Sequence, residues 1–245
     1  MSNFLTDNPA LYEQRFPDPD LEHVGLIAEA MDARLGSGAR DILDLGSGTG
    51  RDAGALAARG HHVVGIDSSP AMVAHSQARH PTATFIEGDL RHSQLGRTFD
   101  VVSCMDSALL YCHTHRDLVA CGEVLKGHLH RGGIFVAEMR NGAFYLGHRR
   151  GLGEPVDDDF VHDGIRYVSR TVLWVDHAAQ LLRRRRTWSW AGAEPLVQES
   201  AWRLVFPDEI RGWLTGLGFT DITLTDETGE SLTGRRLRMV ATFTG

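Results

Sequence analysis

Short apolar runs recur along the first 140 residues, separated by segments in which apolar residues return every three or four positions. The short runs are typical of parallel strands that are buried on both faces, and the wider spacing is typical of amphipathic helices. Strands that alternate with helices predict right-handed crossovers and a doubly wound sheet. The predicted strands are Asp41–Gly46, His62–Asp67, Ala83–Asp89, Phe99–Met105 and Gly133–Met139. The predicted helices are Gly50–Arg59, Ser69–His80 and Arg116–Leu129.

The pattern changes after Arg140, where long stretches rich in β-branched and aromatic residues follow one another without a helical segment between them. Three antiparallel strands are predicted there, and they form an insertion in the α/β pattern. A helix and two further strands then complete the chain. The predicted insertion strands cover residues 164–176, 180–192 and 197–206, and the final helix and strands cover 206–219, 221–227 and 235–243.

A glycine-rich turn follows the first predicted strand and leads directly into a helix. Gly46, Gly48 and Gly50 allow the backbone to approach a ligand closely, and the helix offers free N–H groups at its N-terminus. This arrangement is typical of nucleotide-like ligands. In the dinucleotide fingerprint G-x-G-x-x-G/A, however, the last glycine position is held here by the large, charged Arg51. Asp67 ends the second strand, where a carboxylate suits the ribose of either a nicotinamide or an adenosine cofactor.

Composition narrows the partners further. The chain has 245 residues, 42% of them hydrophobic, and a formal net charge of −7, which favours one large α/β domain and small-molecule partners over nucleic acid or an anionic membrane. No targeting segment or membrane-spanning run is present, so a cytoplasmic location is expected. Lys126 is the only lysine, which excludes a P-loop and the Tyr-x-x-x-Lys pair of short-chain dehydrogenases. Three cysteines without CxxC spacing indicate neither a disulfide framework nor a metal site: Cys104, Cys112 and Cys121.

The third strand adds a more specific feature, because it ends in Glu87-Gly88-Asp89-Leu90, with Asp89 where the amino group of an adenine would lie. With these residues, the segment Asp44–Gly50 and Asp67, the chain resembles the class I S-adenosylmethionine-dependent methyltransferases. Within that family the chain is similar to small-molecule enzymes such as the amino-sugar N,N-dimethyltransferases. The shared stretches are "LYEQ" (11–14), "VVSCMDSALLY" (101–111), "FVAEMRN" (135–141) and "GRRL" (234–237). Two departures stand out: the sugar enzymes carry an aromatic residue at Asp106 and a histidine at Tyr111.

The resemblance implies a Rossmann-like α/β fold with a doubly wound, seven-stranded, mostly parallel sheet and an antiparallel β insertion. It implies four segments along the chain. An N-terminal cap (1–25) precedes the cofactor-binding core (26–140), the β insertion (141–206) forms an acceptor lid or a subunit contact, and the last helix and hairpin (207–245) complete the core sheet. A homo-oligomer is therefore a possible state.

The resemblance also implies S-adenosylmethionine as cofactor and a set of residues that hold it, with no metal. The backbone of the glycine turn, Asp67, Asp89 and Leu90 are expected along the adenosine. Met72 and Met105 either pack on the adenine or belong to the core. The cofactor's carboxylate needs a cation or a hydroxyl from the N-terminal segment, which offers Tyr12, Arg15 and His23. The full set of cofactor candidates is Asp44, Gly46, Ser47, Gly48, Gly50, Asp67, Ser68, Met72, Asp89, Leu90, Met105, Arg15 and His23.

The loop after the fourth strand is expected to face the acceptor, because open α/β sheets bind ligands at this topological switch point. Tyr111 and His113 are candidates to orient or deprotonate the nucleophile, and Asp106 is a candidate to hold a cationic amine. Tyr12 is the fourth catalytic candidate. For His113 the alternative is an exposed loop histidine without a catalytic function.

The most prominent charge run is "LLRRRRTWSW" (181–190). In a strand, Arg184 and Arg186 share a face with two tryptophans, while Arg183 and Arg185 point to the other side. A solvated strand or an edge strand protected by charge is the favoured interpretation, and the alternative is that one pair of arginines lines a pocket for an anionic substrate.

Three functions therefore remain open from the sequence. The first is a methyltransferase that acts on an amine or hydroxyl of a small-molecule acceptor in natural-product biosynthesis. The second is a nicotinamide-dependent oxidoreductase, and the third is a non-catalytic protein that binds a cofactor on the same fold.

Overall fold

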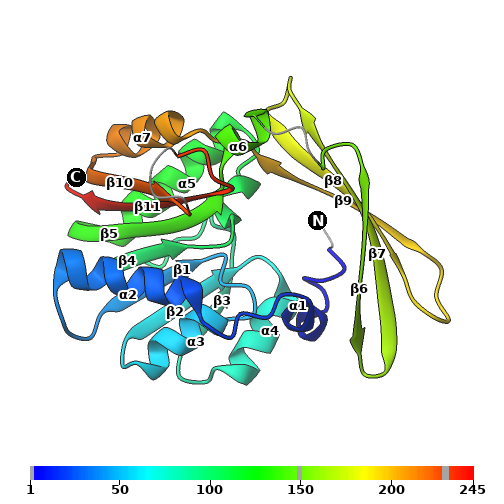
Figure 1. The fold of residues 1–245 in the computed structure, drawn as a ribbon. Coiled ribbons are helices and arrows are strands. Elements are labelled where there is room, and N and C mark those ends of the chain that lie inside the picture. The colour runs from blue at the N-terminus through cyan, green and yellow to red at the C-terminus, as the bar shows by residue number, and fades with distance from the viewer. Residues whose placement is uncertain (1–2, 148–150, 228–231) are drawn as a thin grey trace.

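The computed structural model describes residues 3–147, 151–227 and 232–245, and it has two sheets (Figure 1). A seven-stranded sheet has the order β10-β11-β5-β4-β1-β2-β3, and a four-stranded sheet has the order β6-β7-β8-β9. The predicted fold class is confirmed. The strands of the large sheet are β1 (Asp41–Leu45), β2 (His62–Asp67), β3 (Thr84–Glu87), β4 (Phe99–Cys104), β5 (Leu129–Arg140), β10 (Phe219–Asp226) and β11 (Arg236–Phe243). Those of the small sheet are β6 (Pro155–His162), β7 (Ile165–Asp176), β8 (Leu181–Ser189) and β9 (Leu196–Arg203).

Helices cover both faces of the large sheet and connect its strands. Its first five strands are parallel, and β11 runs antiparallel between β5 and β10. Antiparallel pairs join all strands of the small sheet. The helices are α1 (Pro9–Arg15), α2 (Glu22–Leu35), α3 (Arg51–Ala58), α4 (Pro70–Arg79), η1 (Ala108–Tyr111, a 3₁₀ turn), α5 (His115–His128), α6 (Gly142–Gly147) and α7 (Pro207–Gly216).

Neighbouring residues of each central strand fill two separate cores, because successive side chains point to opposite faces of a sheet. Ile42 belongs to the core under α2 and α3, whereas Leu43 belongs to the core under α5 and α7. Val101 and Val102 divide in the same way. All four side chains are fully buried, which is why the strands read as continuous apolar runs.

Local capping signals agree with the observed helix ends. The Ser69 side chain accepts a hydrogen bond from the N–H of Met72, and Pro70 takes the first position of α4. Thr114 and Asp117 form a capping box that starts α5.

The structure contains elements that the sequence pattern did not reveal. Strand β6 was not predicted, since its sequence PVDDDFVH combines a proline with three aspartates, which have low β propensity. It lies at the edge of the small sheet, where proline and charged residues are tolerated. Helices α1, α2 and α6 and the turn η1 were also not predicted, and β5 begins at Leu129 rather than at Gly133.

Helix α1 lies between the core and the small sheet (Figure 1). Arg15 of α1 forms an ion pair with Asp158 of β6, and the ring of Phe4 stacks on Trp190 at 5.0 Å. On the core side, the Ser69 hydroxyl donates a hydrogen bond to the carbonyl of Thr6. The N-terminal segment is therefore held on both sides. No helix within the described ranges combines the length and the apolar character needed to cross a bilayer.

Candidate cofactor and acceptor site

Packing leaves no room for a side chain at two glycines of the turn between β1 and α3, whereas the third glycine faces open space. All three have positive φ, between 54° and 78°. A Cβ at Gly46 would lie 2.5 Å from the Cβ of Ala108, and a Cβ at Gly50 would lie 2.7 Å from the ring of Phe85. Gly48 has no atom within 4 Å of a Cβ built on it. The middle of the turn is therefore accessible to a ligand.

Three buried polar atoms on and just after this turn have no hydrogen-bond partner among the described residues: Ser47 Oγ, Arg51 Nε and Asp52 Oδ1. Buried groups of this kind normally require a ligand or water to satisfy them. Together they offer a hydroxyl, a cationic donor and an anionic acceptor, which suits a ligand that carries both an ammonium and a carboxylate. Beneath the turn, the buried Asp44 accepts a hydrogen bond from Ser103 Oγ at 2.8 Å, and burial, with the neighbouring Asp52, raises its pKa to about 7.

Asp67, which the sequence predicts to bind the ribose, holds the shape of the turn. Its carboxylate accepts one hydrogen bond from the N–H of Gly48 at 2.9 Å and another from the N–H of Ser69 at 2.8 Å. Burial raises the pKa of Asp67, and the backbone N–H groups oppose this shift. Each carboxylate oxygen can accept a second hydrogen bond. The neighbouring Ser68 is exposed.

The residues predicted to surround an adenine contact other parts of the protein in this structure. Asp89 is held by Arg91, whose Nε and Nη2 donate to its carboxylate at 2.8 and 2.5 Å, and this lowers the pKa of Asp89. Leu90 is half-buried against the core. Met72 and Met105 are buried, and Met105 belongs to the core under α2.

The three N-terminal residues predicted to bind the cofactor's carboxylate all line one cavity. Each of them already contacts an acidic side chain of the protein. The Tyr12 hydroxyl donates to Asp106 at 3.1 Å, and burial and this carboxylate both raise the pKa of Tyr12. Arg15 is paired with Asp158. His23 is bound by two carboxylates.

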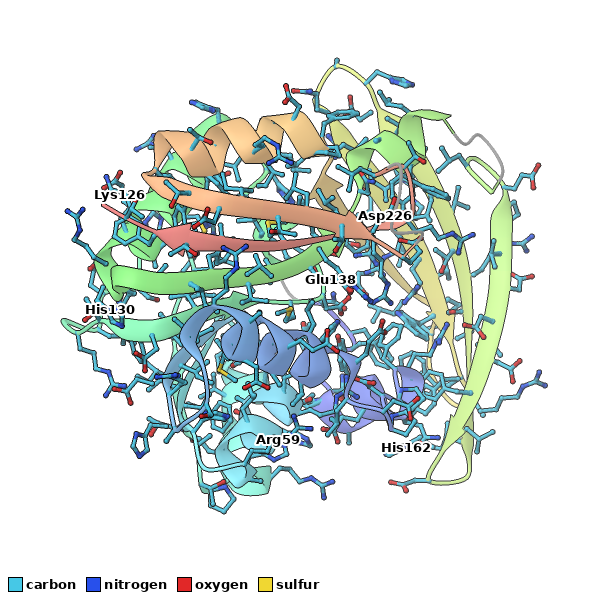
Figure 2. The ribbon with its side chains drawn as sticks, turned by 60° about the vertical axis from the view of Figure 1, so that its left-hand side comes forward. Arg59, Lys126, His130, Glu138, His162 and Asp226 are labelled. Atoms are coloured by element: carbon cyan, nitrogen blue, oxygen red, sulfur yellow. The ribbon has the colours of Figure 1, made fainter. Side chains whose placement is uncertain are left out.

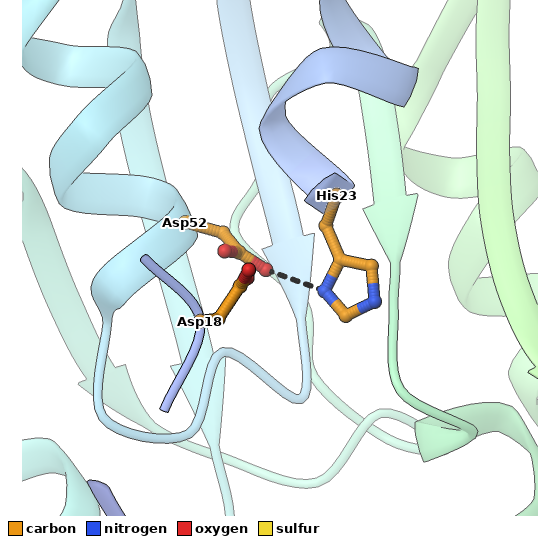
Figure 3. A group of neighbouring side chains, drawn as sticks. All are labelled: Asp18, His23 and Asp52. Atoms are coloured by element: carbon orange, nitrogen blue, oxygen red, sulfur yellow. Dashed lines mark hydrogen bonds and ion pairs between the residues drawn. The ribbon is translucent and has the colours of Figure 1, made fainter. Parts of the chain in front are cut away.

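The imidazole of His23 lies between Asp52 at 3.1 Å and Glu138 at 3.2 Å, and Figure 3 shows the Asp52 contact. Burial disfavours its charge, but the two carboxylates outweigh this effect and raise the pKa of His23 to about 10. Ligand atoms of Asp18, His23 and Asp52 lie within 4.8 Å of one another, the spacing of a metal site. A protonated imidazole has no free lone pair for a metal, and both ring nitrogens are engaged here. The group therefore acts as an ion-pair cluster.

Glu138, near the end of β5, is the centre of this cluster, and its side chain points toward the middle of the molecule (Figure 2). It also accepts hydrogen bonds from Arg236 at 2.5 Å and from Arg238 at 2.8 Å. Burial opposes its charge, but His23 and the two arginines lower the pKa of Glu138 to about 2. The cluster joins α2, α3, β5 and β11 next to the cavity.

The loop after β4 adopts an unusual backbone. Asp106 and Ser107 have φ of 45° and 69°, which costs energy at residues other than glycine. The conformation is held by the Ser107 N–H, which donates to the carbonyl of Glu138, and by the Ser107 hydroxyl, which accepts from Arg140. It leaves the Asp106 side chain exposed at the cavity.

The two aromatic candidates of this loop are placed differently. Tyr111 lines the cavity, with its ring centroid 6.4 Å from that of Trp202 of β9, and burial raises its pKa. His113 instead contacts the carbonyl of Ala201 at 2.8 Å through Nε2, so it ties the loop to the small sheet.

The cavity has a volume of about 470 Å³. Its lining comes from the N-terminal segment, the start of α2, the first residue of α3, the loop after β4, the facing ends of β5 and β11, and the inner face of the small sheet. Arg51, Trp202 and Arg236 line the cavity although the sequence did not mark them as site residues. Arg184 also lines it, in agreement with the alternative interpretation of the arginine run. The lining residues are Asn3, Leu5, Thr6, Tyr12, Arg15, Phe16, Pro17, Asp18, Glu22, His23, Arg51, Asp106, Tyr111, Arg140, Arg184, Trp202 and Arg236.

Comparisons with known proteins bear on this geometry. A family model described as a methyltransferase domain matches residues 42–133, which contain the glycine turn and the loop after β4. The structure of the amino pentose methyltransferase CalS10 of Micromonospora echinaspora, with S-adenosylmethionine bound, has a TM-score of 0.77 and 25% identity over 96% of both chains. Residues 42–133 therefore match a methyltransferase domain, and the chain has the fold of the class I S-adenosylmethionine-dependent methyltransferases.

Two further proteins resemble this chain. Streptomyces venezuelae DesVI has the same fold, with a TM-score of 0.79 and 22% identity over 99% of both chains. A curated N,N-dimethyltransferase of dTDP-3-amino-3,4,6-trideoxy-alpha-D-glucopyranose, also from Streptomyces venezuelae, is 34% identical over 100 residues, which is 41% of this chain. That match spans 42% of the relative's length.

S-adenosylmethionine is bound in the CalS10 structure, and the glycine turn of this chain fits the same cofactor. The amino-acid end of the cofactor carries an ammonium and a carboxylate, and the three orphaned atoms at Ser47, Arg51 and Asp52 offer partners for both. The open face at Gly48 leaves room for its close approach.

Proposed function

We propose that this methyltransferase transfers a methyl group from S-adenosylmethionine to an amine nitrogen of a small-molecule acceptor, a sugar amine of natural-product biosynthesis. Relatives whose names specify amino sugars support the substrate class. O-methylation of a hydroxyl group is the alternative for the same site.

The carboxylate of Asp106, next to the glycine turn, is the observation that favours nitrogen over oxygen as the methyl acceptor. The loop after β4 packs directly on the turn, since Ala108 lies where a Cβ of Gly46 would be. Asp106, two residues earlier, faces the cavity with one carboxylate oxygen bound to the Tyr12 hydroxyl. An exposed carboxylate binds an ammonium group through a charge-assisted hydrogen bond, which is stronger than the hydrogen bond it forms with a neutral hydroxyl group. This arrangement supports an amine acceptor beside the methyl donor.

The chain's own residues would act mainly by positioning. When bound, S-adenosylmethionine supplies an electrophilic methyl group on a sulfonium. Asp106 would hold the acceptor nitrogen in line with this group, and positioning alone can lower the barrier by up to about 7–11 kcal/mol. Tyr111, which stands at the position of the family's catalytic histidine, would orient the amine through its hydroxyl. The Asp106 carboxylate would accept the ammonium proton, which frees the nitrogen lone pair to take the methyl group. Tyr12 would keep the Asp106 carboxylate in place.

We extend the proposal to the cofactor contacts. The turn Gly46–Gly50 would bind the cofactor through its backbone, Asp67 would accept from the ribose hydroxyls, and Asp89 with Leu90 would flank the adenine. Asp89 would do so while held by Arg91, because carboxylate oxygens accept more than one hydrogen bond.

The organisation of the chain is part of the same proposal. Residues 1–25 would cap the site, 26–140 would bind the cofactor, 141–206 would serve as acceptor lid or subunit contact, and 207–245 would complete the core. A cytoplasmic location, a possible homo-oligomer and the absence of nucleic-acid partners remain proposals as well. The competing hypothesis is a non-catalytic protein with this fold, and turnover of an acceptor would exclude it.

The test is formation of S-adenosylhomocysteine with paired acceptors that differ only in an amine or a hydroxyl, for example an amino sugar nucleotide and its hydroxyl counterpart. We expect turnover with the amine only, and Asp106→Asn should raise its KM about tenfold or more, because a charge-assisted hydrogen bond is lost. Asp163→Asn, at an exposed turn, is the matched control. Turnover of the hydroxyl compound alone would contradict N-methylation.

A further inference from the structure

Strand β8 presents two arginines on its inner face, Arg184 and Arg186. Residues two positions apart on a strand point to the same side, with about 7 Å between their backbones. Arg186 is only 9% exposed. Burial of a guanidinium group is costly unless an anion accompanies it.

Within the described part of the chain, neither inner arginine has a carboxylate partner. Arg184 donates from Nε to the hydroxyl of Ser200, and Arg186 donates from Nε to the hydroxyl of Thr171. Hydroxyls satisfy one donor of each guanidinium group and leave the charge uncompensated.

The outer arginines of the same strand differ in this respect. Arg183 contacts Asp176 at 2.9 Å, and Arg185 contacts Glu199 at 2.6 Å. Strand β8 lies between β7 and β9, so the expectation of an edge strand protected by charge is wrong. Ion pairs on the outer face explain the outer pair and leave the inner pair unexplained.

Both inner arginines open onto hollows under the small sheet. Arg184 lines the 470 Å³ cavity, while Arg186 lines a second hollow of about 190 Å³ that shares Arg15 with the first. Arg140 and Arg184 both lie over the ring of Trp202, at 4.3 and 4.7 Å. Their like charges repel, and a bound anion would relieve this repulsion.

Burial lowers the pKa of Arg184 to about 10 and that of Arg186 to about 9, with each neighbouring arginine adding to the effect. Both groups nevertheless remain cationic at neutral pH. They are therefore available as donors to an anion under ordinary assay conditions.

We propose that Arg184 and Arg186 form an anion-binding subsite that takes a doubly charged group of the acceptor while its amine lies at Asp106. The link to the acceptor rests on the proposed function, whereas the anion site itself does not. The shared chemistry of the ligand is two neighbouring negative charges, which a diphosphate ester or a dicarboxylate supplies.

The experiment is calorimetric titration of the full chain at constant ionic strength, with inorganic pyrophosphate and malonate as separate probes. Arg184→Gln and Arg186→Gln should each weaken binding of the preferred probe about tenfold or more, because charged bidentate hydrogen bonds are lost. The matched controls Arg183→Gln and Arg185→Gln change the net charge equally on the opposite face and should leave the affinity within about twofold. If a glutamine variant does not fold, Arg184→Lys and Arg186→Lys retain the charge and should still bind more weakly.

Binding of pyrophosphate but not malonate would identify a diphosphate acceptor, and the reverse a dicarboxylate. Absence of saturable binding of either probe, or equal losses in the inner and outer variants, would overturn the subsite. S-adenosylhomocysteine is titrated into the same samples. Failure of the anion site with intact S-adenosylhomocysteine binding refutes only this subsite, while loss of S-adenosylhomocysteine binding with intact anion binding refutes only the proposed function.

Discussion

The Glu138 cluster allows a quantitative prediction about stability. Glu138→Gln keeps the side-chain shape but removes the charge that His23, Arg236 and Arg238 share. The side chain of Glu138 is only 2% exposed, so water cannot replace the lost carboxylate.

The expected loss is about 3 kcal/mol of unfolding free energy near pH 6. Lowering the pKa of Glu138 from 4.5 to about 2 corresponds to about 3 kcal/mol at roughly 1.4 kcal/mol per unit, and breaking a buried pair typically costs about 3–5 kcal/mol. Because this folded pKa is depressed, the contribution is complete above about pH 4.5 and is lost as pH falls toward 2. The pKa of His23 is raised, so its contribution is complete below pH 6.5 and is lost as pH rises toward 10.

Urea unfolding at pH 6 and pH 9 measures both effects. The wild type should lose stability between these pH values through His23, and Glu138→Gln should show a smaller pH-dependent loss because its imidazole has lost one acidic partner. Glu199→Gln, which removes a carboxylate from an exposed pair, should cost less than about 1 kcal/mol. A loss below 1 kcal/mol for Glu138→Gln, with a wild-type pH profile, would refute the reasoning.

Three further predictions concern the site. Asp67→Ala should abolish cofactor binding in calorimetry, since the ribose acceptor and the anchor of Gly48 are lost together; unchanged affinity would place the ribose elsewhere. Tyr111→Phe should lower kcat while the Kd for S-adenosylmethionine stays nearly constant, and equal loss of both would assign Tyr111 a structural function. Gly50→Ala should destabilise the protein by about 2–4 kcal/mol in urea unfolding, because a Cβ would lie 2.6 Å from Ser76. Gly48→Ala has open space around its Cβ and should cost about 1 kcal/mol. Equal costs for the two variants would show that packing does not set the turn.

The sequence predicted well the features that depend on local periodicity. The central parallel strands were evident because two-sided burial makes neighbours such as Ile42 and Leu43 both apolar. The alternation of side chains along a strand is enough to separate Arg184 and Arg186 from Arg183 and Arg185. The edge strand β6 was missed, because its aspartates are tolerated only where a sheet has a free edge.

Long-range contacts were beyond the reach of the sequence pattern. His23 and Glu138 are 115 positions apart, and nothing local to either residue indicates that they meet. The contact of His113 with Ala201 likewise depends on how the small sheet docks on the loop after β4. Arg91 follows Asp89 by two residues, yet only the turn geometry brings its guanidinium onto that carboxylate.

Isothermal calorimetry with S-adenosylmethionine, S-adenosylhomocysteine and NADH tests the central claim most directly. The glycine turn with its open Gly48 and its orphaned Ser47, Arg51 and Asp52 atoms predicts saturable binding of the first two ligands and none of NADH. Binding of NADH alone, or of none of the three, would contradict the assignment of this turn to S-adenosylmethionine.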